Sequence, residues 1–140
     1  MTARIALFDL GNVVVDWEPA RLYRQRFDDP AEAERFCAEI CTMDWHQAHD
    51  AGVPMAENMK PLIKAHPHYE GHIRAWADEW MEMFHGYVPG VPPQIGRLED
   101  AGTPLYALTN MSSETSEMTF DAFPIIRVFR DIVVSGDEGV

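Results

Sequence analysis

The sequence has few positive charges. Of its 140 residues only 11 are lysine or arginine, against 23 aspartate or glutamate, and the formal net charge at pH 7 is −12. This balance disfavours a nucleic acid or an anionic membrane as partner, because such surfaces are bound through lysine and arginine. An anionic ligand would have to be held locally, by a cation, by backbone N–H groups at a helix start or by a few placed bases.

Long apolar runs and a secretion signal are also lacking. No stretch is apolar enough over a sufficient length to cross a bilayer, and the N-terminus lacks the order of a signal peptide, so we expect a cytoplasmic protein without a membrane partner. Cysteine is scarce. Cys37 and Cys41 lie four residues apart in a predicted helix, where a disulfide is poorly arranged. We interpret them as buried or half-buried thiols, with a metal pair as the alternative.

What the sequence does contain is a short apolar run that ends in an acid. Residues 5–8 are apolar, Asp9 follows, and the turn residues Gly11 and Asn12 end the run. Such a run is typical of a strand buried on both faces of a parallel sheet, and ligands bind at the carboxyl ends of such strands. Asp9 is therefore a candidate catalytic group, with a helix cap or turn cap as the alternative.

The pattern between residues 15 and 89 is helical. Apolar residues recur at three- and four-residue spacing, and several segments begin with proline or an N-cap residue such as Asp29. The predicted helices cover residues 19–27, 30–40, 55–67, with a kink at Pro61, and 69–84. No convincing strand is predicted in this region.

Two more strands and two helices are predicted after residue 90. The strand at residues 104–109 ends in Thr109 and Asn110, Ser112 or Ser113 can cap the helix after it, and a third strand covers residues 131–134. We therefore expect an α/β protein: a partial Rossmann-like parallel sheet core of residues 1–14 and 90–140, with an inserted α-helical cap of residues 15–89. Right-handed crossovers would make the first two strands neighbours.

In this arrangement Asp9 and Thr109 would face one pocket. A carboxylate nucleophile beside hydroxyl, amide and helix-start N–H donors suits phosphoryl transfer, in which positioning and charge stabilisation do most of the catalysis. The alternative is that Thr109 and Ser112 are turn and cap residues only.

At these positions the sequence resembles a known family. Residues 5–13, which include Asp-Leu-Gly-Asn, resemble the first motif of the haloacid dehalogenase superfamily, and residues 105–110 resemble its second. Residues 44–45 and 50–54 are placed as in the small helical cap of the subfamily of 2-haloacid dehalogenases and sugar-phosphate phosphatases. The Asp-Leu-Gly-Asn form is similar to a bacterial phosphatase branch that acts on hexose phosphates.

The resemblance implies a role for each matched residue. Asp9 would be the nucleophile that forms an aspartyl-phosphate, and would bind Mg²⁺ together with the backbone carbonyl of Gly11. Thr109 would hydrogen-bond the transferring phosphoryl group, and Asn110 would add donors. Trp45 in the cap would help to close the pocket and to select the leaving group.

The sequence departs from the family pattern at two points. Most family phosphatases carry a second aspartate two residues after the nucleophile, where this chain has Gly11, so protonation of the leaving group falls to water or to a cap residue. The lysine of the third motif and the acids of the fourth are not found. The only lysines lie in the predicted cap, and residues 135–140 resemble the lead-in to the missing lysine. We expect a truncated member whose open apolar sheet edge, at Ile5 and Leu7, favours self-association.

The leading functional hypothesis is a Mg²⁺-dependent phosphatase of a small phosphorylated metabolite. A close alternative is a 2-haloacid dehalogenase, in which Asp9 attacks carbon without a metal. That chemistry requires an arginine early in the cap, where Ile40 and Cys41 stand and Arg35 is near. A third hypothesis, of another class, is a non-catalytic fragment or pseudoenzyme that binds other proteins.

Two histidine pairs also suggest a metal. His46 and His49 are three residues apart, and His66 and His68 flank a proline. Because neither pair has a third ligand at a matching spacing, we predict that these histidines are solvated polar residues.

Overall fold

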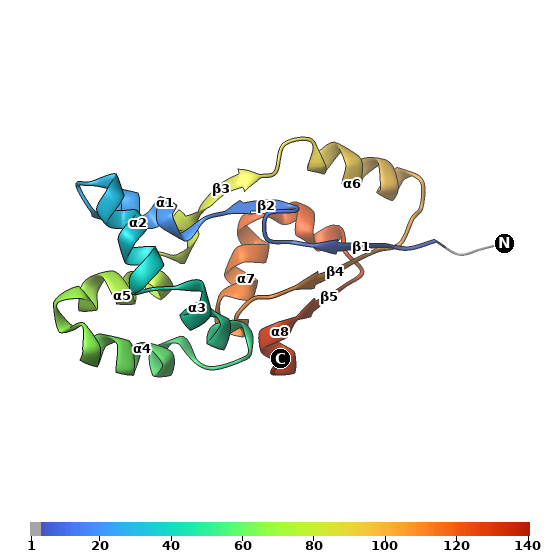
Figure 1. The fold of residues 1–140 in the computed structure, drawn as a ribbon. Helices are drawn as coiled ribbons and strands as arrows, with labels where there is room; N and C mark the ends of the chain where they lie inside the picture. The colour runs from blue at the N-terminus through green and yellow to red at the C-terminus, as the bar shows by residue number, and fades with distance from the viewer. Residues whose placement is uncertain (1–3) are drawn as a thin grey trace.

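Three short apolar runs form one parallel sheet in the computed structural model, which describes residues 4–140. The strands β1 (Ala6–Asp9), β4 (Leu105–Thr109) and β5 (Asp131–Val134) lie in the order β1-β4-β5 (Figure 1). Asp9 pairs with Leu108, and Thr109 pairs with Val134. The carboxyl ends of the three strands therefore lie at one edge, and β1 and β4 are neighbours as predicted. The expected α/β class is confirmed.

Helices cover one face of this sheet. They are α6 (Val91–Asp100), α7 (Ser113–Ala122), a 3-10 helix (Pro124–Val128) and the short α8 (Ser135–Glu138). Ser112 caps α7, because its hydroxyl accepts a hydrogen bond from the backbone N–H of Glu114 at 3.1 Å. The buried apolar residues of this part include Leu10, Ile95, Leu105, Ala107, Phe120, Ile126, Phe129 and Val134.

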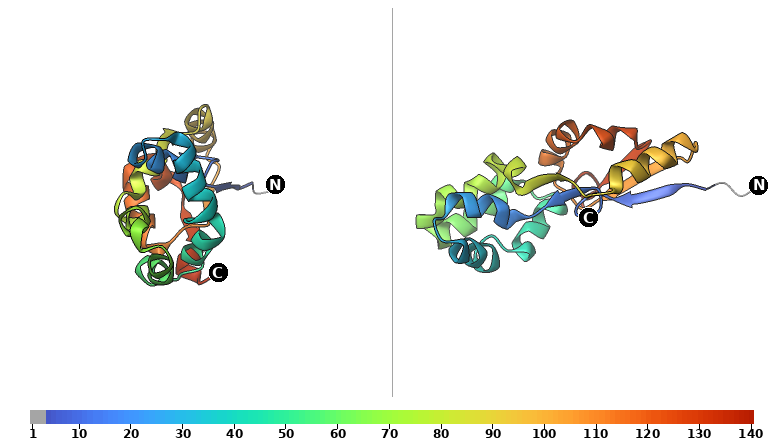
Figure 2. Two further views of the ribbon diagram at one scale, coloured as in Figure 1. Left: turned by 60° about the vertical axis from the view of Figure 1, so that its left-hand side comes forward. Right: turned by 90° about the horizontal axis from the view of Figure 1, so that it is seen from above.

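The inserted helices form a second part, at the other end of an elongated molecule (Figure 2). They are α1 (Pro19–Arg26), α2 (Pro30–Glu39), α3 (Met43–Asp50), α4 (Met55–Ala65) and α5 (Glu70–Asp78), with 3-10 helices at Pro67–Tyr69 and Trp80–Met83. As predicted, the Asp29 side chain caps α2, accepting from the N–H of Ala31 at 2.9 Å. Among residues 4–140 no helix has both the length and the apolar character to cross a membrane.

This second part has an aromatic core of its own. Its buried residues include Leu22, Tyr23, Phe36, Met59, Ile73, Trp76 and Trp80. As predicted, the two thiols are shielded: Cys41 is buried and Cys37 half-buried. The division into residues 1–14 with 90–140 and residues 15–89 stays a proposal, because the two apolar clusters share Met81 and Phe84.

Two strands between the parts correct the prediction of an all-helical insertion. Strands β2 (Val15–Trp17) and β3 (Phe84–Tyr87) pair in antiparallel fashion, so the prediction of no strand between residues 15 and 89 was wrong. The predicted helix over residues 69–84 was too long, because α5 ends at Asp78 and a 3-10 turn follows. Gly86 has a φ of +134°, which a helix cannot contain, and Val15 buries its side chain completely in this ribbon.

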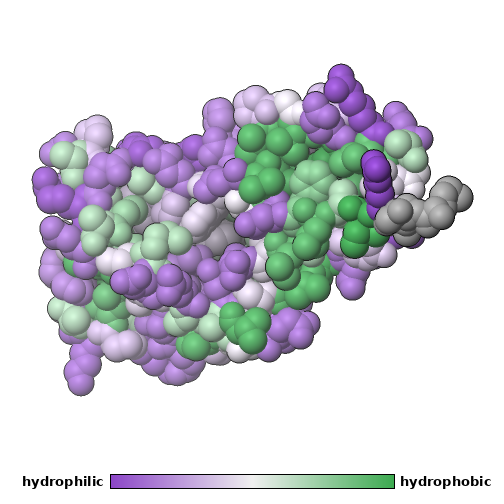
Figure 3. All heavy atoms as spheres, turned by 45° about the vertical axis from the view of Figure 1, so that its right-hand side comes forward, coloured by the Kyte–Doolittle hydropathy of each residue, from purple (hydrophilic) through white to green (hydrophobic). Residues whose placement is uncertain are grey.

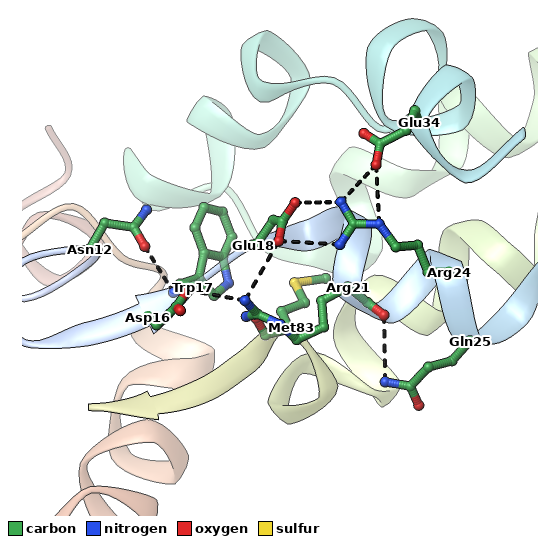
Figure 4. Close-up of polar contacts among 9 residues, drawn as sticks. All are labelled: Asn12, Asp16, Trp17, Glu18, Arg21, Arg24, Gln25, Glu34 and Met83. Atoms are coloured by element: carbon green, nitrogen blue, oxygen red, sulfur yellow. Dashed lines mark hydrogen bonds and ion pairs between the residues drawn. The ribbon is translucent and has the colours of Figure 1, made fainter. Parts of the chain in front are cut away.

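Polar contacts anchor the insertion where the chain enters and leaves it (Figure 4). The guanidinium of Arg21 donates to the carbonyl oxygen of Met83 at 2.6 Å and to the carboxylate of Asp16 at 3.1 Å. Arg24 contacts Glu18 at 2.6 Å and Glu34 at 2.7 Å. The entering strand, α1, α2 and the chain before the returning strand are thus linked.

The second face of the sheet is uncovered in the part of the chain that the structure describes. Leu7, Leu108 and Val133 are 65%, 51% and 40% exposed, and the strand register puts all three on that face. Ile5, just before β1, is 63% exposed. Figure 3 shows apolar side chains gathered at the sheet end of the molecule. A contiguous apolar surface of this kind is typical of an interface.

We expect this 140-residue chain to self-associate through that face. Leu7→Lys should shift the protein toward monomer, because a charge would have to be buried in the contact. Sedimentation velocity over a range of concentrations measures the shift, and Met118→Lys, at an exposed position of α7, is the matched control. A monodisperse monomer that unfolds cooperatively before any substitution would contradict the expectation.

Gly136→Ala should destabilise the fold. A methyl group there would lie 2.6 Å from the backbone nitrogen of Ser113 and 2.8 Å from the carbonyl oxygen of Met111, neither of which can move freely. We expect a loss of about 1–3 kcal/mol in the free energy of unfolding, measured in urea. Gly96→Ala in α6, where nothing lies within 4 Å, should be neutral or stabilising. Equal effects of the two substitutions would contradict this packing argument.

Candidate active site

The carboxyl edge of the sheet opens into a small cavity that the insertion closes. Its volume is about 200 Å³. Four of the predicted site residues lie together in its wall: Asp9, Gly11, Thr109 and Asn110. The remaining wall is formed by Asn12, Val15, Trp17, Met43, His46, Asp50, Trp80, Phe84 and Met111.

Asp9 is the last residue of β1 and its carboxylate is exposed at the cavity. One carboxylate oxygen accepts a hydrogen bond from the N–H of the next residue, Leu10, at 2.8 Å. The turn that follows is held by its own main chain, because the N–H groups of Val13, Val14 and Val15 all donate to the carbonyl oxygen of Leu10. The turn therefore does not depend on Asp9 as a cap, which favours the catalytic interpretation.

Asn12 shapes the turn. Its φ of 59° is left-handed, a conformation that asparagine tolerates better than most residues. Its side-chain oxygen accepts from the backbone N–H of Trp17 at 2.9 Å (Figure 4). This contact directs the entering strand so that Trp17 reaches the cavity. Gly11, one residue earlier, has open space where a side chain would begin.

Ser135 joins the sheet edge to the insertion. Its hydroxyl accepts from the backbone N–H of Met111 at 3.1 Å and donates to the carbonyl oxygen of Asp50 at 2.5 Å. Met111 follows Thr109 and Asn110, and Asp50 is the last residue of α3. The end of β4 and the end of α3 are thus fixed to one another through a single side chain.

Aromatic side chains form the wall on the insertion side. The rings of Trp17 and Trp80 lie 5.5 Å apart, and Trp17 lies 5.3 Å from the imidazole of His46. The indole N–H of Trp80 donates to the hydroxyl of Thr119 at 3.0 Å, whereas the indole N–H of Trp17 is buried without a partner. Oδ1 of Asp50 is buried without a partner as well.

Behind this wall lies a buried polar network. Nδ2 of Asn58 lies 3.0 Å from Nε2 of His49, the two Nδ1 atoms of His49 and His46 are 3.2 Å apart, and Nε2 of His46 lies 3.3 Å from Oδ1 of Asp50. Burial, and next the neighbouring His46, lower the pKa of His49 to about 4.

The prediction that this histidine pair is solvated was wrong. His46 is 3% exposed and His49 is 0% exposed, because both lie on the inner side of α3 and satisfy each other's ring nitrogens. Among residues 4–140 no group of three or more histidine, cysteine, aspartate or glutamate side chains is arranged to hold a metal ion.

Trp45 does not line the cavity. Its indole N–H donates to the carbonyl oxygen of Asn58 at 3.1 Å, and its ring lies 5.3 Å from that of Trp76 inside the insertion. Trp17 lines the cavity in the position that we expected for Trp45. The spacing of Met43, His46 and Asp50, at i, i+3 and i+7, marks the face of α3 that meets the cavity, and Trp45 falls outside it.

No lysine or arginine is among the described residues of the cavity wall. Arg35, the nearest candidate for a halide site, lines a separate groove of α2 with Glu32 and Glu39. The carboxylate of Asp9 and the carbonyl oxygen of Gly11 are hard oxygen donors of the kind that Mg²⁺ takes, with waters and substrate oxygens completing its shell.

Comparison with known proteins identifies the fold. No family model matches this sequence, and no curated protein matches it. Among solved structures, a haloacid dehalogenase (HAD) family enzyme from Bacteroides thetaiotaomicron matches with a TM-score of 0.66 and 14% identity, over 100% of this chain and 72% of the enzyme. The wild-type complex of that enzyme with magnesium and inorganic phosphate matches with a TM-score of 0.65 and 14% identity, over 99% of this chain and 72% of the enzyme. A dehalogenase matches with a TM-score of 0.60 and 15% identity, over 99% of this chain and 65% of the dehalogenase chain.

These matches confirm the resemblance at the level of the fold. The chain has the fold of haloacid dehalogenase family enzymes, which the order and spacing of the two short motifs, together with the helical insertion, predict.

His49 should make the stability of the protein depend on pH. Its pKa in the folded protein is about 4, below its ordinary value of 6.5, so between these values the unfolded chain binds a proton that the folded chain does not. The free energy of unfolding should therefore fall as the pH drops from 6.5 toward 4, by about 2 kcal/mol between pH 7 and pH 5. Urea denaturation at the two pH values measures the loss.

His49→Gln should remove most of this pH dependence, whereas His68→Gln, at an exposed position, should retain it. The same loss of stability in the unmodified protein and in His49→Gln would contradict the assignment.

Proposed function

We propose that this protein is a Mg²⁺-dependent phosphatase that hydrolyses a small phosphorylated metabolite through an aspartyl-phosphate on Asp9. One observation carries the proposal. The carboxylate of Asp9 and the hydroxyl-bearing Thr109 stand at the ends of neighbouring parallel strands and line one cavity, which the insertion closes. A nucleophile, hydrogen-bond donors and a shielded site are what phosphoryl transfer requires.

Each residue of the sheet edge has a distinct part in the reaction. A carboxylate oxygen of Asp9 attacks phosphorus, and the bond to the leaving oxygen breaks. The Thr109 hydroxyl and the Asn110 amide donate to the phosphoryl oxygens as charge develops on them. The aromatic wall of Trp17, Trp80 and Phe84 limits the access of water until the leaving group has departed.

The charge of the site argues for a metal ion. With no lysine or arginine in the described wall, a phosphoryl dianion would meet the carboxylate of Asp9 without any compensating side chain. Bound Mg²⁺ would supply that positive charge and polarise the phosphoryl group. The match to an enzyme whose complex contains magnesium and inorganic phosphate supports this part of the proposal.

The wall favours a hydroxylated leaving group such as a sugar. The aromatic rings of the wall pack well against a sugar face. A dehalogenase would need a halide-binding cation, and Arg35 lies in another groove. We therefore rank dehalogenation second.

Asp9→Asn should abolish the release of inorganic phosphate from sugar phosphates and from p-nitrophenyl phosphate in the presence of Mg²⁺, because an amide does not form the phosphoryl intermediate. Removal of Mg²⁺ with EDTA should have the same effect on the unmodified protein. The matched control is Asp131→Asn, since Asp131 also accepts from the N–H of its next neighbour, at 2.9 Å, but stands at the opposite end of the sheet.

Phosphate release by Asp9→Asn at the rate of the unmodified protein would refute the proposal. Release of chloride from a 2-haloacid without Mg²⁺ would assign a dehalogenase instead. Absence of any affinity for phosphate or Mg²⁺ at millimolar concentration would leave the protein-binding hypothesis.

A further inference from the structure

We propose that Asp50, which the insertion contributes to the cavity, is the general acid and base for the leaving group. The inference rests on the proposed phosphatase function and extends it to the proton that the leaving oxygen must receive. The turn after the nucleophile offers no acid for this step, since its second residue is Gly11.

Few groups in the cavity could supply the proton. The titratable side chains in the described wall are Asp9, His46 and Asp50. Asp9 is consumed as the nucleophile, so the two residues of α3 remain.

The hydrogen bonds among Asn58, His49 and His46 exclude His46 as the proton donor. Nδ2 of Asn58 donates to the carbonyl oxygen of Trp45 at 2.9 Å and faces Nε2 of His49 at 3.0 Å, so this nitrogen of His49 is an acceptor. A neutral His49 then carries its proton on Nδ1 and donates it to Nδ1 of His46, 3.2 Å away. His46 therefore holds its single proton on Nε2, and a neutral imidazole is a poor acid.

The same network positions Asp50. Nε2–H of His46 lies 3.3 Å from Oδ1 of Asp50 without the alignment of a hydrogen bond, and that oxygen has no other partner. At the main chain, the carbonyl oxygen of Asp50 accepts from Ser135, whose hydroxyl also holds the backbone next to Asn110. The carboxyl group is thus fixed relative to the phosphate-binding end of β4.

In the first half of the reaction, the bond from an Asp9 oxygen to phosphorus forms, the bond from phosphorus to the leaving oxygen breaks, and the proton of the Asp50 carboxyl group goes to the leaving oxygen, which departs as an alcohol. In the second half, water attacks phosphorus, the bond from phosphorus to Asp9 breaks, and the Asp50 carboxylate takes a proton from the water. Phosphate leaves, and both carboxyl groups return to their starting states.

The test compares substrates whose leaving groups need the proton to different degrees. Asp50→Asn should lower kcat/KM for an alkyl phosphate such as glycerol phosphate by about 10²–10⁴-fold, the usual contribution of a general acid. The same substitution should change kcat/KM for p-nitrophenyl phosphate by less than about tenfold, because nitrophenolate departs without a proton. Asp44→Asn, at an exposed position of the same helix, should leave both values unchanged.

Two further measurements complete the design. Gly11→Asp in the Asp50→Asn background places a carboxyl group in open space beside the nucleophile and should restore part of the alkyl phosphate activity. If Asp50→Asn did not fold, kcat/KM of the unmodified protein would be measured on a series of aryl phosphates that differ in the pKa of the leaving group. A shallow dependence of kcat/KM on that pKa would support a general acid. A steep dependence would overturn the proposal.

Equal losses on glycerol phosphate and p-nitrophenyl phosphate in folded Asp50→Asn would also overturn it, while leaving the phosphatase function in place. If the unmodified protein with Mg²⁺ hydrolysed neither substrate, the proposed function itself would fail, and the role of Asp50 would fail with it.

Discussion

The parallel pairing of β1 with β4 is the constraint on which the site depends. Asp9 stands opposite Leu108, so β4 extends one residue further and ends in Thr109 at the same edge. A register shift by one residue would turn the side chains of one strand to the opposite face. Asp9 and Thr109, the proposed nucleophile and phosphate-binding residue, are therefore brought to one edge by backbone hydrogen bonds, before any side chain of the site makes a contact of its own.

A second layer of contacts fixes the insertion above this edge. Arg21 donates to the carbonyl oxygen of Met83 and so joins the segments where the chain enters and leaves the insertion. Ser135 links the end of β4 to the end of α3. Ser135 begins α8, directly after β5, so all three strands of the sheet take part in positioning the cavity. Trp80 belongs to the aromatic wall of the cavity, and its indole N–H donates to the hydroxyl of Thr119 on α7.

The sequence was sufficient for those features that depend on local chemistry. The apolar run before Asp9, the cap at Asp29 and the cap at Ser112 each follow from a few adjacent residues, and each is present. The ribbon of β2 and β3 was missed because its partners lie about 70 residues apart, and because the spacing of Trp80, Met83 and Phe84 continues a helical period through a 3-10 turn into a strand.

The cavity residues of the insertion were missed for a related reason. The place of Trp45 beside a motif predicts a cavity residue, but the face of α3 that meets the sheet is set by tertiary packing, and it carries His46 and Asp50 instead. For His46 and His49, a pair without a third metal ligand, the sequence predicts solvated side chains. Their hydrogen bonds to each other and to Asn58, nine residues beyond His49, become visible only when α3 and α4 are packed together.

The distribution of groups between the two parts has a consequence for how the site works. The sheet edge carries the proposed nucleophile and phosphate donors but no second acid, since Gly11 leaves that space open. The insertion contributes Trp17 and the carboxyl group of Asp50, which is 15% exposed, to the cavity wall. Neither part has the complete set, so the proposed reaction and the selection of its leaving group would both require the arrangement that Ser135 and Arg21 maintain. A change at either anchor would therefore act on both processes together, although neither residue lines the cavity.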